Sequence, residues 1–261
     1  MTSARWPELP ILGEVALPAL PGNADQVLWP GLFDLADNLP THHVVIGGVM
    51  VHLHGAVAGR HSQRPTRDVD VLLDVGVMPS SIKDAVRILN GMGYRIAQNS
   101  PDESSHRYIG PAGETVDVLA PAGVKPPPDL TTTPPGQTIE VYAGKGALQH
   151  RVLIRASYSG RVSYIPVPDL PRAMQLKAAA YASQWRRSQA SAFNSRHLTD
   201  LVHLVTLIDD VTEILAHLGT APPAGHLSLA EVLDNTAHHA WAAAGTATVD
   251  AQLNWEVLRQ K

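Results

Sequence analysis

Two acidic side chains stand two residues apart in an otherwise apolar segment. Asp68 and Asp70 alternate with Val69, Val71 and Leu73, and residues two apart in a β-strand point to the same face. The two carboxylates would therefore lie side by side, where a divalent cation offsets both their repulsion and their loss of water. Because no His or Cys accompanies them, the expected ion is a hard one, Mg²⁺. The alternative is a solvated acidic face or a cap.

A glycine pair upstream supplies a second feature of the same kind of site. Gly47 and Gly48 follow the apolar run 43–46 and precede a helix whose expected apolar face consists of Val49, Met50, Leu53 and Val57. Glycines between a strand and a helix allow backbone N–H groups to approach a phosphate, and the helix N-terminus adds partial positive charge. The alternative is a tight turn without a ligand. Together with the paired acids, the glycines predict a nucleoside triphosphate site for phosphoryl or nucleotidyl transfer.

A third acid interrupts a later apolar strand. Residues 107–110 and 115–119, joined by a turn at 111–113, have the pattern of a β-hairpin. Asp117 lies in the second of these strands, where it is either exposed at an edge or directed into the cleft. In the cleft it would complete the metal site or act as a general base.

Two helices are expected further along the chain. The first begins near Pro171 and carries Lys177 beside its apolar face, and the second carries Asp200 beside a buried stripe. Lys177 would either contact a triphosphate or extend its ammonium group to water. Asp200 would either orient Lys177 or the bound nucleotide, or form an ordinary surface pair with Arg196.

The ordered set of motifs resembles a known superfamily. Gly-Gly, then Arg64-Pro65-Thr66-Arg67-Asp68-Val69-Asp70, then a lone strand Asp and the helical Lys and Asp are similar to nucleotidyltransferases with a DNA polymerase β-like core. More narrowly, residues from about 43 to about 208 resemble the AbiEii-type nucleotidyltransferase toxins of bacterial toxin–antitoxin systems, including the mycobacterial enzymes that modify tRNA. The resemblance implies a catalytic set of Asp68, Asp70, Asp117, Lys177 and Asp200, with the first three as metal ligands. It implies nucleotide binding by Gly47, Gly48, Arg64, Thr66 and Lys177.

The same resemblance implies a Mg²⁺-dependent enzyme that moves a nucleotidyl group from an NTP to an acceptor hydroxyl. The implied acceptor is the 3′ end of tRNA, and the implied role is that of a toxin restrained by an antitoxin protein. One departure is Val49, where many members of the superfamily have a serine that contacts phosphate. Backbone N–H groups, Thr66 or Arg64 would have to supply that contact here. A small-molecule nucleotidyltransferase of the antibiotic-modifying type and a non-catalytic nucleotide-binding module remain alternatives.

Composition limits the kind of partner. The chain has 261 residues and a net charge of −4, so it does not have the charge of a general nucleic-acid binder. Any RNA contact must depend on local basic patches around the helical half, for which we name Arg151, Arg155, Arg161, Arg172, Arg186, Arg187 and Arg196. Without cysteine there is neither a disulfide framework nor a thiolate zinc site. The absence of a signal peptide and of a long apolar run favours a soluble cytoplasmic protein without membrane contact.

The expected fold is α/β (α+β), with a nucleotidyltransferase core in which helices flank a mixed sheet, followed by a helical C-terminal half. We place an N-terminal arm at residues 1–30, packed on the body or on a partner. The core then covers residues 31–168 and the helical domain residues 169–261. A break at residues 219–225 precedes an Ala-rich tail with one or two further helices.

Overall fold

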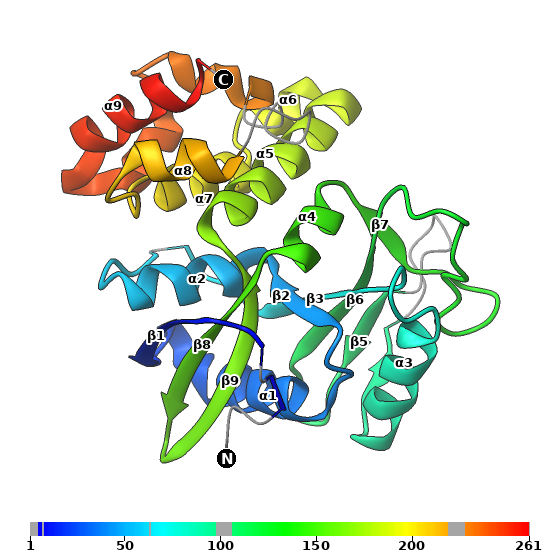
Figure 1. Ribbon diagram of the computed structural model, residues 1–261. Helices are drawn as coiled ribbons and strands as arrows, with labels where there is room; N and C mark the ends of the chain where they lie inside the picture. The colour runs from blue at the N-terminus through cyan, green and yellow to red at the C-terminus, as the bar shows by residue number, and fades with distance from the viewer. Residues whose placement is uncertain (1–4, 7, 63, 98–105, 219–227, 261) are drawn as a thin grey trace.

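The computed structural model describes residues 5–6, 8–62, 64–97, 106–218 and 228–260. Two β-sheets lie toward one end of the molecule, and the helices that follow them in the sequence gather at the other end (Figure 1). The mixed α/β class that the sequence predicts is confirmed. In the described residues no helix combines the length and the apolar character needed to cross a membrane.

The larger sheet carries the acidic strands. Its path is β2-β3-β6-β5-β4, and β7 also pairs with β6. The bounds are β2 (His43–Ile46), β3 (Asp68–Leu73), β4 (Arg95–Ile96), β5 (Arg107–Ile109), β6 (Thr115–Pro121) and β7 (Ile139–Val141). Strands β3 and β6 run parallel, whereas β2 is antiparallel to β3 and β5 is antiparallel to β6. The expected hairpin is therefore present as β5 and β6.

A smaller sheet has the order β1-β8-β9, with β1 (Ile11–Ala16), β8 (Arg151–Tyr158) and β9 (Arg161–Pro168). Strand β1 pairs in parallel with β8, so the described part of the expected N-terminal arm packs on the body. Helix α1 (Asp25–Asn38) crosses the boundary that we expected at residue 30. The reason is Trp29, which is fully buried and donates its indole N–H to the Pro18 carbonyl at 2.8 Å.

The remaining helices divide into those that flank the sheets and those that form the C-terminal part. The first group contains α2 (Gly47–Val57), α3 (Ser81–Gly91), α4 (Gly144–Gln149) and the 3₁₀ turn η2 (Pro21–Asn23). The second group contains α5 (Leu170–Arg187), α6 (Gln189–Ala192), α7 (Arg196–Val205), α8 (Val211–Leu218), η4 (Ser228–Asp234), η5 (His239–Ala247) and α9 (Thr248–Leu258). The expected boundary after residue 168 falls between β9 and α5. The expected break at 219–225 lies outside the described residues.

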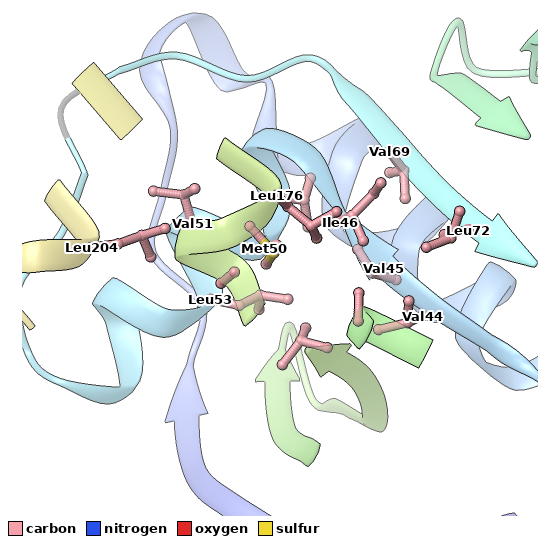
Figure 2. Packing of buried hydrophobic residues seen from close by; sticks show 14 of the residues in the cluster. Val44, Val45, Ile46, Met50, Val51, Leu53, Val69, Leu72, Leu176 and Leu204 are labelled. Atoms are coloured by element: carbon pink, nitrogen blue, oxygen red, sulfur yellow. The ribbon is translucent and has the colours of Figure 1, made fainter. Parts of the chain in front are cut away.

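Helix α2 forms the centre of the core. We expected a single apolar face, but every residue from Gly48 to Ala56 is buried, because α2 contacts β1, β2, β3, α5 and α7. A helix buried on all sides is typical of such a central position, and here the buried residues include His52 and His54. Figure 2 shows Met50 and Leu53 of α2 among side chains of β2 and Leu176 of α5. The first turn of α2 is therefore fixed by packing between the sheet and the helical half.

Helix α5 begins near Pro171, as the sequence predicts. The Asp169 carboxylate accepts a hydrogen bond from the backbone N–H of Arg172, and Pro171 lies in the first turn. Such an N-cap satisfies one of the N–H groups that a helix leaves without an internal partner. The cap thus defines where α5 begins, and α5 then packs against α7.

Candidate functional site

Three carboxylates converge on the larger sheet. The parallel register of β3 and β6 places Asp70 directly opposite Asp117, and Asp68 shares the face of Asp70. One oxygen from each of Asp68, Asp70 and Asp117 lies within 4.8 Å of the other two. Asp117 is only 6% exposed, so its expected alternative as an exposed edge residue is wrong. An all-oxygen donor set of this kind has the chemistry that hard divalent cations prefer, and these residues fit such an ion.

The electrostatic cost of this arrangement falls on Asp70. Burial, followed by the charges of Asp68 and Asp117, raises the pKa of the Asp70 carboxyl to about 7, and the opposite charges of Lys177 and Arg196 only partly offset this. The elevated pKa means that the three carboxylates resist being ionised together. A bound cation would remove that resistance, which is the compensation that the paired acids led us to expect.

Gly47 allows Asp70 to lie against the first turn of α2. The residue has a φ of 73°, and a Cβ atom built on it would lie 1.6 Å from the Asp70 Oδ2 atom. Any other residue at position 47 would therefore displace the Asp70 carboxylate. The neighbouring Gly48 is similarly restricted, because its Cβ would lie 2.5 Å from Thr66 Oγ1 and 2.6 Å from Arg64 Nη2. The glycine turn and the acidic strand thus meet in space, as the motif order predicts.

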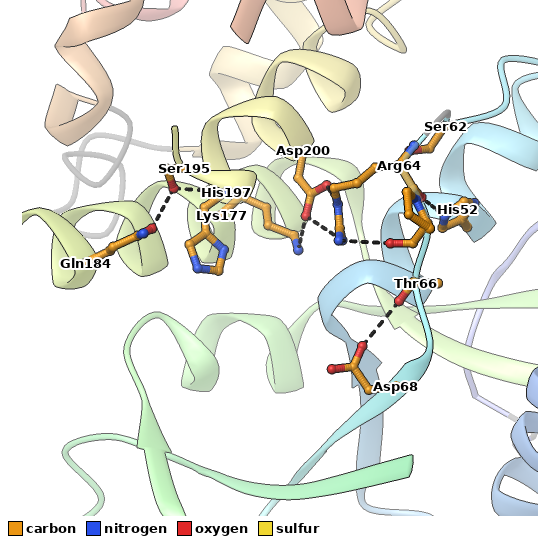
Figure 3. Close-up of polar contacts among 11 residues, drawn as sticks. His52, Ser62, Arg64, Thr66, Asp68, Lys177, Gln184, Ser195, His197 and Asp200 are labelled. Carbon is orange, nitrogen blue, oxygen red and sulfur yellow. Dashed lines mark hydrogen bonds and ion pairs between the residues drawn. The ribbon is translucent and has the colours of Figure 1, made fainter. Parts of the chain in front are cut away.

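Asp200 links two cations from different parts of the chain (Figure 3). Its Oδ2 atom accepts from Lys177 Nζ at 2.7 Å, and Arg64 donates from Nε to Oδ1 at 2.6 Å and from Nη2 to Oδ2 at 3.1 Å. Lys177 is 5% exposed and Asp200 is 1% exposed. The two non-catalytic alternatives considered for these residues are therefore wrong: Lys177 does not extend to water, and Asp200 does not form a surface pair with Arg196. Burial alone would raise the pKa of Asp200, but Lys177 and Arg64 hold it below its usual value.

A cavity of about 150 Å³ lies between the acids and these cations. Its lining includes Gly47 and Gly48 at the start of α2, Asp68 and Asp70 on β3, and the side chains of Arg64 and Lys177. Thr66 lies just outside this lining and donates a hydrogen bond from Oγ1 to Asp68 Oδ1 at 3.4 Å. The first N–H groups of α2 have no partner within the helix and add positive potential at the same place. The cavity therefore pairs an acidic wall with a cationic wall, as a metal–phosphate complex requires.

A second hollow of about 550 Å³ adjoins this cavity. The two share Arg196 and His197, and the outer hollow is otherwise lined by Gln184, Arg187, Ser191 and Asn194. Its lining, within the described part of the chain, contains two arginines and no acid. We call this outer hollow the basic basin. Its charge suits an anionic molecule that reaches the acids through the inner cavity.

Only some of the arginines that we expected in a basic patch contribute to this surface. Arg187 and Arg196 line the basin. Arg155 and Arg161 instead lie on β8 and β9, where they pair with Glu14 and Asp34. Arg151 is also on β8 and donates to the Thr41 carbonyl. The expectation that these three surround the helical half is wrong, because the strands that carry them belong to the smaller sheet.

Sequence reasoning missed Arg107 as a site residue. It lies opposite Asp117 in the β5–β6 ladder, and its Nε and Nη2 atoms donate to both Asp117 oxygens at 2.8 and 2.7 Å. A signal was present in the sequence: a hairpin centred on residue 112 pairs position 107 with position 117.

His197 was also missed as a residue of the site. Its Nδ1 atom is buried and has no hydrogen-bond partner among the described residues. Burial, followed by the charges of Lys177 and Arg196, lowers its pKa to about 3, so the ring is neutral at physiological pH. A neutral imidazole of this kind can donate or accept a hydrogen bond at the junction between the inner cavity and the basin.

Comparisons of this chain with protein families, with curated proteins and with solved structures give no significant match. The arrangement of the residues themselves therefore indicates what the site can do. That arrangement clusters Asp68, Asp70 and Asp117. Asp68 and Asp70 line the same cavity as Lys177 and Arg64, the two cations that Asp200 joins.

Proposed function

We propose that the protein is a metal-dependent nucleotidyltransferase that transfers a nucleotidyl group from an NTP to an acceptor hydroxyl. The observation that carries the proposal is that two of the three clustered carboxylates, Asp68 and Asp70, line one cavity together with the glycine turn and the buried Lys177. The acidic cluster, the glycine turn and the buried lysine could each, taken singly, have a purely structural role. Their shared location, with acids and cations lining one cavity, is the arrangement that binding of a metal–triphosphate complex needs.

Asp68, Asp70 and Asp117 would hold the divalent ion, for which we propose Mg²⁺. When bound, such an ion supplies Lewis-acid activation and neutralises charge that develops at the reacting phosphate. Lys177 and Arg64 act as fixed positive charges for the phosphate oxygens. Because Asp200 already holds both cations in place, little ordering is needed when the nucleotide binds.

The reaction is a displacement at the α-phosphorus of the NTP. The acceptor oxygen forms the new P–O bond, and the bond to the oxygen bridging the α- and β-phosphates breaks, so that pyrophosphate leaves. The acceptor hydroxyl also loses its proton, which a neighbouring carboxylate can accept. Both oxygens of Asp117 already accept hydrogen bonds from Arg107, which argues against Asp117 as the general base.

For the acceptor we propose the 3′ end of tRNA, following the resemblance of the motifs to AbiEii-type toxins. The charge of the surface supports this acceptor: the basic basin lies next to the inner cavity and, within the described residues, has no acid in its lining. A small cationic acceptor would need an acidic or apolar pocket instead. The associated proposal is that the enzyme restrains growth and is itself restrained by an antitoxin protein.

The test is a transfer assay with purified full-length protein. Total tRNA, MgCl₂ and each α-³²P-labelled NTP are incubated with the wild type, with Asp70→Asn and with the control Asp84→Asn, whose half-buried carboxylate pairs with Arg87 on α3. We expect labelled tRNA with the wild type and with Asp84→Asn. We expect at least about a hundredfold less with Asp70→Asn, because the ligand charge is lost.

A parallel reaction uses tRNA whose terminal diol has been oxidised with periodate. If the 3′ end is the acceptor, this tRNA accepts no label. Label that remains on oxidised tRNA would place the acceptor elsewhere on the RNA. In a further reaction a cell extract replaces the tRNA, and label on a low-mass product would favour a small-molecule acceptor. Equal labelling of tRNA by the wild type and by Asp70→Asn would contradict the proposed catalytic site.

A further inference from the structure

Arg107 makes direct contact with the proposed metal ligands. It reaches from β5 so that its guanidinium donates to both oxygens of Asp117, and its Nη2 atom lies 3.5 Å from Asp68 Oδ2. The Arg107 side chain is 48% exposed, whereas that of Asp117 is 8% exposed. The guanidinium therefore covers the outer side of the acidic cluster.

This contact places two kinds of cation in competition. A forked guanidinium–carboxylate pair occupies a lone pair on each carboxylate oxygen, and a divalent ion held by Asp117 and Asp68 needs oxygens of the same two groups. The two positive charges would also repel each other over a few ångströms in a partly buried site. Arg107 therefore opposes binding of a free divalent ion, although it stabilises the ionised carboxylates.

We propose that Arg107 is an internal competitor for the metal ligands, and that it makes the site bind the divalent ion together with the triphosphate rather than alone. This inference rests on the proposed function. The triphosphate brings several negative charges and additional oxygen ligands, which offset the positive charge of Arg107 and give its guanidinium a second anionic partner. In chemical terms, the substrate that the site selects is the metal–nucleotide complex.

The test compares four proteins: the wild type, Arg107→Gln, Arg107→Lys and the control Arg161→Gln. Arg161 is a matched control because its side chain is 46% exposed and pairs with Asp34 at 2.7 Å, on β9 of the smaller sheet. Gln removes the charge of Arg107, and Lys keeps the charge but loses the fork. Circular dichroism and thermal melts establish that each variant is folded.

Equilibrium dialysis with MnCl₂ measures the Mn²⁺ retained by each protein, with and without an equimolar mixture of the four α,β-methylene NTP analogues. Without nucleotide, we expect Arg107→Gln to bind Mn²⁺ about tenfold more tightly than the wild type, and we expect Arg107→Lys to be intermediate. Arg161→Gln should match the wild type. With the analogues present, the difference between Arg107→Gln and the wild type should shrink to about twofold, since the phosphates offset the guanidinium charge.

Unchanged or weaker Mn²⁺ binding by folded Arg107→Gln, while the wild type binds Mn²⁺ with the analogues, would overturn this inference alone. In that case Arg107 would support the site rather than compete for it. A wild type that retains no Mn²⁺ in either condition would overturn both this inference and the metal site of the proposed function. These two failures are thus distinguishable by the wild-type measurement.

Discussion

The buried link between Asp200 and Lys177 allows a stability prediction that does not depend on function. Asp200→Ala removes the carboxylate that accepts from Lys177 and Arg64. The Arg64 side chain is 21% exposed and can turn toward water, but the Lys177 side chain is only 6% exposed. Lys177 would therefore be left as a buried ammonium group without its ion-pair partner.

The expected magnitude follows from that asymmetry. Removing one partner of a buried ion pair costs about 3–5 kcal/mol of unfolding free energy, because the remaining charge is uncompensated. Lys177→Met should cost about 1–3 kcal/mol, because Asp200 keeps both hydrogen bonds from Arg64. The double variant, which combines Asp200→Ala with Lys177→Met, leaves no unpaired ammonium group. Its loss of unfolding free energy should therefore be about 2 kcal/mol smaller than the sum of the two single losses.

The assay is urea unfolding of all four proteins at pH 7, followed by tryptophan fluorescence and circular dichroism. The matched control is Lys83→Met, which removes the same ammonium group from an exposed pair with Asp129 and should leave the midpoint unchanged. Additive single costs, or a cost below about 1 kcal/mol for Asp200→Ala, would refute the reasoning. Either result would mean that Lys177 reaches water when Asp200 is absent.

Three further predictions concern the acids, the glycine turn and His197. Because the pKa of Asp70 is about 7 and that of an unfolded Asp is about 3.9, the folded protein binds more protons between these values. In buffers with EDTA its unfolding free energy should therefore fall as pH rises from 4 to 7, and it should lose up to about 4 kcal/mol. Asp70→Asn should flatten this fall in pH-dependent urea unfolding; an equally steep profile would exclude Asp70 as its source. Gly47→Ala should abolish the proposed nucleotidyl transfer and lower the melting temperature more than the control Gly123→Ala does, because only the Gly47 Cβ would meet Asp70. Both glycines have a φ of 73°, so equal effects of the two variants would show that backbone strain alone is responsible. His197 should stay neutral down to a pH of about 3, so its imidazole NMR signals should not shift between pH 5 and 8, and a titration in that range would contradict the burial of its ring.

Much of the acidic half of the site could be predicted from the sequence because it depends on local periodicity. The alternation of Asp68 and Asp70 with apolar residues determines that both carboxylates share one face of β3. The hairpin turn likewise brings β5 against β6, and its register places Arg107 opposite Asp117. These features involve neighbours in the sequence, for which backbone geometry leaves few alternatives.

The cationic half could be predicted only in part. The spacing of the C-terminal helices indicated where Lys177 and Asp200 lie, but not that both are buried. Arg64 and Asp200 are 136 positions apart, and no pattern around either residue specifies the other. His197 likewise belongs to the site only because α7 packs against α5. Side-chain burial depends on which elements meet, and local sequence does not encode that choice.

By itself, the sequence determined the faces and starts of the elements: which side of β3 is acidic, where glycines begin α2, and where Pro171 lies in the first turn of α5. Only the tertiary structure decided that β6 pairs in parallel with β3, so that Asp117 meets Asp70. The physical reason is that apolar strands can pair in many orders at similar local cost, and loop closure adds little preference. Packing of the whole core around α2 selects one order, and that order creates the site.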